Sequence, residues 1–160
     1  MNRLVPIILG SERDLEHAKK ISTGLEKWKL PFEYRVASAH KHPAYLLQLL
    51  EEYDHSGRLV VYVTVAGRSD GLSATTSANT ANPVIACPPY SEKYGGASVF
   101  STFYVPSRSC PMLIEDPSNV GDAVAKIYAL SDAELREQLL RWTDLTKQEI
   151  GDADKLLRTK

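Results

Sequence analysis

Three features that would point to other classes of protein are scarce in this chain. Its 160 residues include only two cysteines, Cys87 and Cys110, whose spacing fits no metal-ligand pattern. The apolar run near the start, Leu4 to Leu9, is too short for a membrane span or a signal-peptide core. The 19 basic and 20 acidic side chains leave a net charge of −1, so no field of one sign attracts nucleic acid or an anionic membrane. We therefore expect a cytoplasmic single domain with reduced, mostly buried thiols and with neither nucleic acid nor membrane as a partner.

Strand-like and helix-like segments alternate along the chain. The expected strands are short, apolar and rich in β-branched residues: Leu4 to Leu9, Phe32 to Ser38, Leu59 to Val65, Pro83 to Cys87 and Met112 to Ile114. Helices are expected after Ser11, from Pro43, over Ser69 to Thr80, Ala97 to Tyr104 and Ser118 to Leu130, and from a capping-box pattern at Ser131 onward. This alternation predicts an α/β fold: a three-layer αβα sandwich with a flavodoxin-like, doubly wound parallel sheet of five strands and a long C-terminal helix.

Polar turns follow three of the expected strands. They are Gly10-Ser11-Glu12-Arg13-Asp14, Ser38-Ala39-His40-Lys41 and the loop from Ala66 to Leu72. Ligands of open α/β sheets bind beyond the carboxyl ends of the strands, and all three turns lie at such ends. The sequence therefore predicts one binding site for a phosphorylated small molecule along this sheet edge.

Each turn also has a simpler interpretation. The first suits phosphate at a helix N-terminus and ribose at Asp14, or it is an ordinary helix cap. His40 suits proton transfer near neutral pH, or it is a structural histidine. Arg68 suits a carboxylate or carbon dioxide oxygen, or it pairs with Asp70. We expect His42 to face solvent or cap the next helix, and we expect the remaining histidines, His17 and His55, to be surface residues.

Taken in order, these motifs resemble the PurE family of purine biosynthesis over about residues 4 to 130. The family carries a glycine-serine-x-serine-aspartate turn, then serine-alanine-histidine with a basic residue, then an alanine-glycine loop. Its class II branch has lysine after the histidine and an alanine-glycine-arginine-serine-asparagine-glycine-leucine loop, matched here by Lys41 and Ala66-Gly67-Arg68-Ser69-Asp70-Gly71-Leu72. The stretch from Asn79 to Pro89 is also similar to class II, and the His-Leu-Pro-Gly of the mutase branch is missing from the sequence.

The resemblance implies carboxylation of 5-aminoimidazole ribonucleotide (AIR) by carbon dioxide to 4-carboxy-AIR, without ATP, biotin or metal. It implies that His40 is catalytic, that Ser11, Ser38 and Lys41 hold phosphate, and that Asp14 holds ribose. The loop from Ala66 to Leu72 would cover the base and carbon dioxide. The full set of implied substrate-binding residues is Gly10, Ser11, Arg13, Asp14, Ser38, Ala39, Lys41, Ala66, Gly67, Arg68, Ser69, Asp70, Gly71 and Leu72.

The family further implies a homo-octamer or homotetramer. The chain is expected to form one PurE-like domain over residues 1–160, with the helical part from about residue 132 packing on a neighbouring subunit. Apolar side chains available for that packing are Leu139, Leu140, Trp142 and Leu145.

Five residues depart from the family pattern. Arg13 replaces a serine, Asp70 an asparagine, Ser98 an aspartate, Tyr104 an arginine and Arg108 a glycine. Three alternatives therefore stay open beside the class II carboxylase. They are the mutase reaction on N5-carboxy-AIR, the same kind of chemistry on another ribonucleotide, and nucleotide binding without catalysis.

Overall fold

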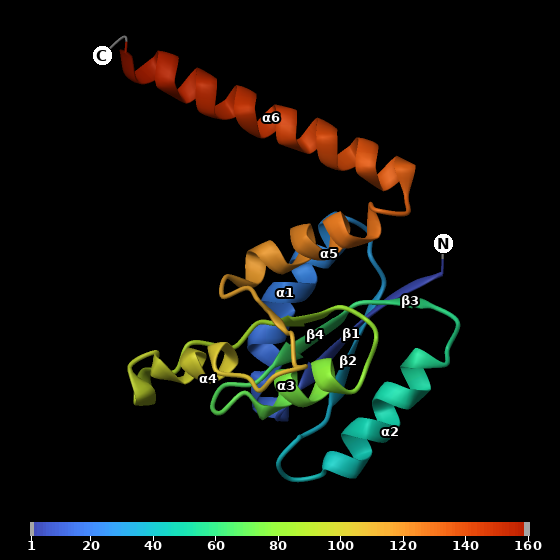
Figure 1. Ribbon diagram of the computed structural model, residues 1–160. Coiled ribbons are helices and arrows are strands. Elements are labelled where there is room, and N and C mark those ends of the chain that lie inside the picture. Colours follow the sequence, from blue (N-terminus) through green and yellow to red (C-terminus); the bar gives the residue numbers. More distant parts are fainter. Residues whose placement is uncertain (1, 159–160) are drawn as a thin grey trace. The chain divides into compact units, whose positions relative to one another are not determined.

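A parallel β-sheet forms the centre of the fold in the computed structural model, which describes residues 2–158 (Figure 1). The sheet runs in the order β2-β1-β4-β5-β6, and every pairing is parallel. Its strands are β1 (Arg3–Leu9), β2 (Phe32–Val36), β4 (Tyr62–Val65), β5 (Val84–Ala86) and β6 (Met112–Leu113). The short β3 (Leu59–Val60) pairs with β1. This order is that of flavodoxin-like sheets and confirms the predicted fold class.

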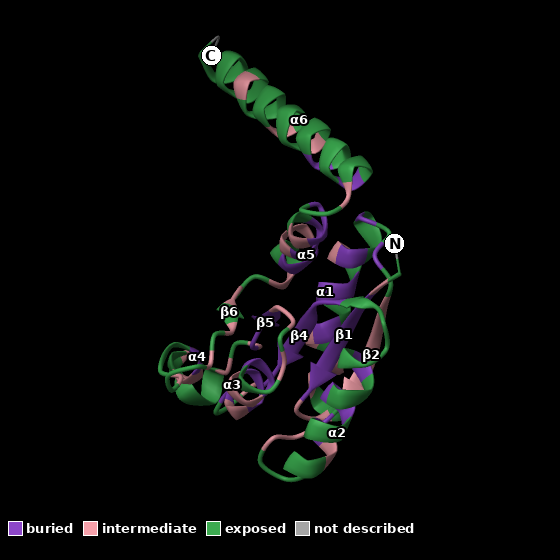
Figure 2. Cartoon of the chain, turned by 45° about the vertical axis from the view of Figure 1, so that its right-hand side comes forward, coloured by how far each residue is buried: buried purple, intermediate pink, exposed green. Residues whose placement is uncertain are grey.

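The segment expected as one strand from Leu59 to Val65 is divided in two. Leu59 and Val60 pair with Arg3 and Leu4, and pairing resumes where Val63 lies opposite Ile7. β3 and β4 therefore follow the same edge of β1, and the sheet has the five strand positions that the sequence predicts. β1 and β4 are buried almost throughout (Figure 2), as expected of strands covered on both faces.

Helices cover both faces of this sheet (Figure 1). On one face, side chains of α2 (Pro43–Asp54) and α3 (Gly71–Ala78) share a hydrophobic cluster with Ile8 and Tyr62. α1 (Leu15–Lys27) follows the 3-10 turn η1 (Glu12–Asp14) and buries Ala18, Ile21 and Leu25. In α2, Leu49 is buried whereas Leu47 is exposed.

The helix expected over Ala97 to Tyr104 is shorter and less regular. It consists of the 3-10 turn η3 (Ala97–Val99) and one turn of α-helix, α4 (Phe100–Phe103), after a separate turn η2 (Glu92–Tyr94). A further 3-10 turn, η4 (Pro117–Asn119), precedes α5 (Val120–Tyr128).

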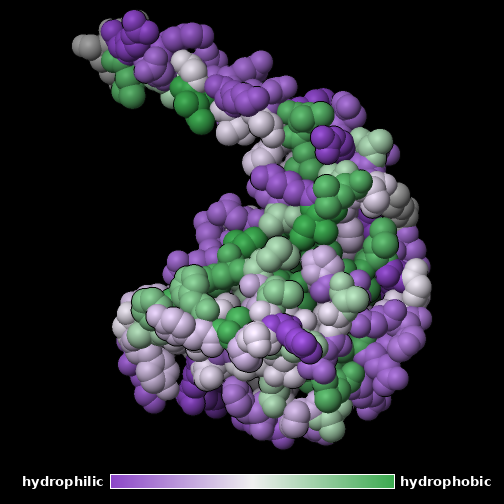
Figure 3. All heavy atoms as spheres, in the orientation of Figure 1, coloured by the Kyte–Doolittle hydropathy of each residue, from purple (hydrophilic) through white to green (hydrophobic). Residues whose placement is uncertain are grey.

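The chain divides into two compact units, one up to Asp122 and one from Ala123 onward. The second unit contains most of α5 and the 26-residue helix α6 (Ala133–Arg158). Asp132 caps α6 by accepting a hydrogen bond from the backbone N–H of Leu135 at 3.0 Å, so the cap lies one residue after the Ser131 that the capping-box pattern indicated. Figure 3 shows green, hydrophobic areas among the polar ones along α6. The large hydrophobic residues that are exposed on this helix are Leu140, Leu145, Ile150, Leu156 and Leu157. Across residues 2–158, no helix has both the length and the hydrophobicity of a membrane span.

The two cysteines are free thiols in different surroundings. Cys110 is exposed, contrary to expectation, whereas Cys87 is fully buried after β5. The Cys87 Sγ lies 3.5 Å from Nε2 of His17, which is half-buried rather than on the surface as expected. Burial, with a smaller effect of the charge on Asp116, raises the pKa of Cys87 to about 12.

The thiols should therefore react at very different rates. We expect an aromatic disulfide reagent at pH 8 to modify Cys110 rapidly, because only that thiol is accessible, and to spare Cys87, which stays protonated. The absorbance of the aromatic thiolate that the reagent releases counts the cysteines that react. It should show one rapidly reacting cysteine in the native protein, and none in a Cys110→Ser variant until urea is added. Two fast groups in the native protein would contradict the burial of Cys87.

Candidate functional site

The three polar turns meet at the carboxyl edge of the sheet. They follow β1, β2 and β4, which are neighbours in the sheet order. The turns surround a cavity of about 840 Å³, a size common for small-molecule sites. Its lining from the three turns consists of Gly10, Ser11, Glu12, Arg13, Asp14, Ser38, Ala39, His40, Lys41, Ala66, Gly67, Arg68, Ser69 and Leu72. The structure thus brings the three turns together around one cavity, as the sequence predicted. The role of each residue stays a prediction.

The first turn is held by its own hydrogen bonds. The Ser11 hydroxyl caps η1 by accepting from the backbone N–H of Arg13 at 3.3 Å. Asp14 lies between this turn and the third, because a Cβ added to Gly67 would be 3.6 Å from its Oδ1. Burial raises the pKa of Asp14, and a hydrogen bond with the Ser11 backbone opposes the shift. The carboxylate is therefore placed to accept hydrogen bonds from a ligand in the cavity.

The second turn presents His40 and Lys41 to solvent. The Ser38 hydroxyl accepts a hydrogen bond from the backbone N–H of Lys41 at 3.2 Å, which closes the turn. His42 is exposed and caps α2 through Nδ1, which accepts from the backbone N–H of Tyr45 at 3.3 Å, as the sequence indicated. Pro43 then occupies the first turn of the helix. The capped helix fixes the end of the turn, and His40 reaches the cavity from it.

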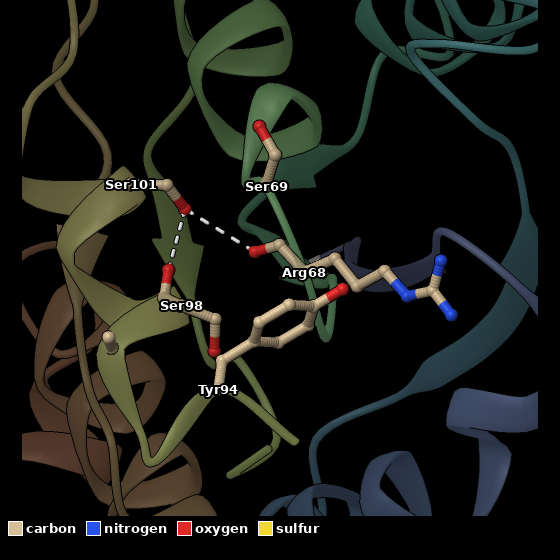
Figure 4. Close-up of a pocket in the computed structure, with 6 residues that line it drawn as sticks. Arg68, Ser69, Tyr94, Ser98 and Ser101 are labelled. Atoms are coloured by element: carbon tan, nitrogen blue, oxygen red, sulfur yellow. Dashed lines mark hydrogen bonds between the residues drawn. The ribbon is translucent and has the colours of Figure 1, made fainter. Parts of the chain in front are cut away.

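The third turn carries Arg68 and Ser69, both exposed at the cavity. Its backbone is tied to the α4 segment, because the Ser101 hydroxyl donates to the carbonyls of Ser98 at 2.7 Å and Arg68 at 3.4 Å (Figure 4). A smaller cavity of about 460 Å³ lies between the third turn and the segment that contains Tyr94 and Ser101. The Arg68 guanidinium points away from Ser98 and Ser101 (Figure 4), which leaves it available to an anionic ligand group.

Asp70 was expected among the ligand-binding residues, but its side chain points into the protein. It is 3% exposed and caps α3. Its Oδ1 accepts from the backbone N–H and hydroxyl of Ser73 at 3.0 and 2.6 Å, and its Oδ2 accepts from the Thr102 hydroxyl at 2.6 Å. Within residues 2–158, no ion pair joins Asp70 to Arg68. The carboxylate is therefore an anchor for the loop, and it does not line the cavity.

Gly71 also lies outside the cavity lining, although it was expected to bind substrate. Its contact is with His40: a Cβ at this position would lie 2.8 Å from Cε1 and 2.9 Å from Nε2 of the imidazole. The ring of His40 therefore packs on the first turn of α3.

Four further residues line the cavity and were not singled out from the sequence. Glu12 belongs to the first turn, and the others follow β5: Pro89, Tyr90 and Ser91. Pro89, Tyr90 and Ser91 could have been found from their position after a parallel strand, because β5 also ends at this edge of the sheet. The two prolines of this segment, Pro88 and Pro89, indicate by themselves only the end of the strand.

Arg108 has a backbone conformation that glycine adopts more easily than other residues. Its φ is +68°, in the left-handed region that disfavours side chains with a Cβ. We expect Arg108→Gly to raise the free energy of unfolding by roughly 0.5–1 kcal/mol, and the melting temperature by a few degrees, because this strain is removed. Thermal unfolding followed by circular dichroism measures the change. The control is Arg58→Gly, at an exposed position whose φ is not positive, and we expect it to lower the free energy of unfolding. A melting temperature of Arg108→Gly below that of the wild-type protein would refute the prediction.

The similarity to known proteins extends over nearly the whole chain. A family model described as AIR carboxylase matches residues 4–149. The chain belongs to this family, also called PurE. Phosphoribosylaminoimidazole carboxylase of Archaeoglobus fulgidus is 46% identical over 152 residues, which are 95% of this chain and 83% of that protein. The Treponema denticola enzyme of the same name is 34% identical over 158 residues, which are 99% of both chains.

Solved structures of the family have the same fold. The crystal structure of Treponema denticola PurE matches with a TM-score of 0.90 at 33% identity, covering 96% of this chain and 97% of that chain. Family membership and fold therefore agree with the resemblance carried by the three turns, and they assign the chain to an enzyme family of purine biosynthesis.

Proposed function

We propose that this protein carboxylates AIR with carbon dioxide to give 4-carboxy-AIR. The observation that carries the proposal is the single cavity of about 840 Å³ shared by the His40 turn, the Gly10 turn and the arginine-bearing loop. Together these turns supply a proton-transfer group, a phosphate cradle and a cation for a carboxylate.

In this reaction the protein mainly has to position the two reactants and accept one proton. The nucleophilic ring carbon of AIR donates its electron pair to the carbon of carbon dioxide, a carbon–carbon bond forms, and negative charge moves to the new carboxylate. The ring carbon then loses its proton to His40, and the aromatic imidazole is restored. Holding the two reactants together lowers the barrier by removing the entropy of their encounter. The proton acceptor contributes a further factor of about 10² to 10⁴.

The polar groups of the turns suit the parts of this substrate. The phosphate lies with Ser11, Ser38 and Lys41, where hydroxyls, a cation and helix ends converge. The ribose hydroxyls donate to Asp14. Arg68 faces the carboxylate that forms.

Two features support the direct carboxylase over the mutase that rearranges N5-carboxy-AIR. Lys41 follows the catalytic histidine, and the loop after β4 reads Ala66-Gly67-Arg68-Ser69-Asp70-Gly71-Leu72, both similar to class II. The loop arginine is one of the lining residues of the cavity. We accordingly propose an ATP-independent carboxy-lyase that needs no biotin or metal. Its cytoplasmic location and its assembly as a homo-octamer or homotetramer are part of the same proposal.

A direct assay tests the reaction. Purified protein is mixed with AIR and bicarbonate without ATP, and formation of carboxy-AIR is followed by its ultraviolet absorbance. Turnover supports the carboxylase. Turnover of N5-carboxy-AIR alone would establish the mutase reaction instead, and calorimetric binding of AIR without any turnover would establish a protein that binds the nucleotide and does not catalyse.

A further inference from the structure

The imidazole of His40 lies against the start of α3. The ring packs against Gly71, the first residue of α3, so closely that a Cβ there would lie 2.8 Å from Cε1. Real Cβ atoms do not approach other heavy atoms this closely, so any side chain at position 71 requires the ring to move. Gly71 has no positive φ that would require a glycine, which leaves this contact as the physical reason for the missing side chain.

The surface on which the ring packs is anchored to the sheet by a chain of buried hydrogen bonds. Asp70, directly before Gly71, accepts from Thr102 at 2.6 Å and from the Ser73 hydroxyl at 2.6 Å. The Ser73 hydroxyl is in turn 2.7 Å from Oγ1 of Thr64 on β4. Asp70, Ser73, Thr64 and Thr102 are all buried, so each bond is shielded from water. The start of α3 is therefore fixed between β4 and α4.

We propose that Gly71 is a positioning residue, whose bare backbone sets the place and plane of the His40 ring, and that Asp70 holds Gly71 in place through its buried hydrogen bonds. The inference rests on the proposed role of His40 in proton transfer. It also accounts for the aspartate of this chain. The buried carboxylate accepts three hydrogen bonds, and it serves the loop backbone instead of contacting the substrate.

A methyl group at position 71 tests the contact directly. We expect Gly71→Ala to lower kcat about a hundredfold with KM changed less than about threefold, because a displacement near 1 Å at the reacting group costs that much in rate. The matched control is Gly151→Ala, which adds the same methyl to a helical glycine with no atom within 4 Å and should keep the wild-type rate.

A second measurement does not depend on turnover. In protein with isotopically labelled histidine, the Cε1–H signal of His40 is the one that disappears in His40→Asn. We expect Gly71→Ala to move this signal and to leave those of His17 and His55 in place. A wild-type protein that fails to carboxylate AIR would overturn the proposed function, yet the signal would still decide whether Gly71 positions the ring.

A second variant loosens the anchor without adding bulk beside the ring. Thr102→Val removes the hydroxyl that donates to Asp70 and keeps the shape of the side chain. We expect the His40 signal to move and kcat to fall roughly tenfold, whereas the control Thr23→Val on the exposed side of α1 changes neither. An unmoved His40 signal in Gly71→Ala overturns the inference whatever happens to the rate, and the same signal in Thr102→Val decides it if Gly71→Ala does not fold.

Discussion

Replacing His40 with asparagine is expected to lower kcat for AIR carboxylation by about 10² to 10⁴, while AIR still binds with nearly wild-type affinity. Asparagine keeps a polar side chain of similar reach but has no group that accepts and releases a proton near neutral pH. The phosphate and ribose would still contact the first turn and Lys41, so binding should survive the loss of proton transfer.

The absorbance assay gives the rate, and isothermal titration with AIR gives the affinity. The matched control is His55→Asn, which makes the same change at an exposed histidine at the end of α2. That variant should keep the wild-type rate. Retention of more than about a tenth of the wild-type kcat by His40→Asn would exclude the imidazole as the principal proton acceptor.

Adding one methyl group at Gly121 is expected to destabilise the protein by about 3 kcal/mol. α1 and the start of α5 touch backbone to backbone, and a Cβ on Gly121 would lie 2.1 Å from the carbonyl carbon and 2.2 Å from the oxygen of Gly24. The helices do not slide apart easily, because Asp122 accepts from Nε1 of Trp28 at 2.6 Å and from Lys27 at 3.0 Å. The overlap with rigid backbone therefore forces the α5 start away from α1.

A graded pair of variants tests this crossing. A Cβ on Gly24 would be 3.2 Å from the carbonyl oxygen of Ser118, a contact that small shifts relieve. We expect Gly24→Ala to cost about 1 kcal/mol or less, and Gly121→Ala to lower the melting temperature by roughly 6–12 °C. Gly151→Ala again serves as the control. Equal melting temperatures for the Gly121→Ala and wild-type proteins would show that the helices do not cross at these glycines.

Much of the fold was predictable because its signals are local. The β-branched, nearly uncharged runs around Ile7 and Val63 identified buried strands, and Pro43 marked the first turn of α2. The same logic located the three turns of the cavity, since the carboxyl ends of parallel strands lie at one edge of a sheet. The break at Val61 and the short α4 were not predictable, since the sequence there continues an acceptable strand or helix pattern.

Side-chain direction was harder to predict than side-chain position. Asp70 and Arg68 belong to one short loop, yet one carboxylate is buried and the neighbouring guanidinium lines the cavity. The donors that bury the carboxylate come from Ser73 nearby and from Thr102, which is 32 residues away. A buried charge needs such partners, and no local pattern reveals the distant one.

The sequence by itself determined the class of fold, the family and the three turns that border the cavity, because strand periodicity and short motifs depend on neighbours along the chain. Only the tertiary structure decided that Gly71 supports the His40 ring, that Thr102 donates a hydrogen bond to Asp70, and that residues after β5 complete the cavity. These are contacts between segments far apart in the chain, and they exist only once the sheet has brought the segments together.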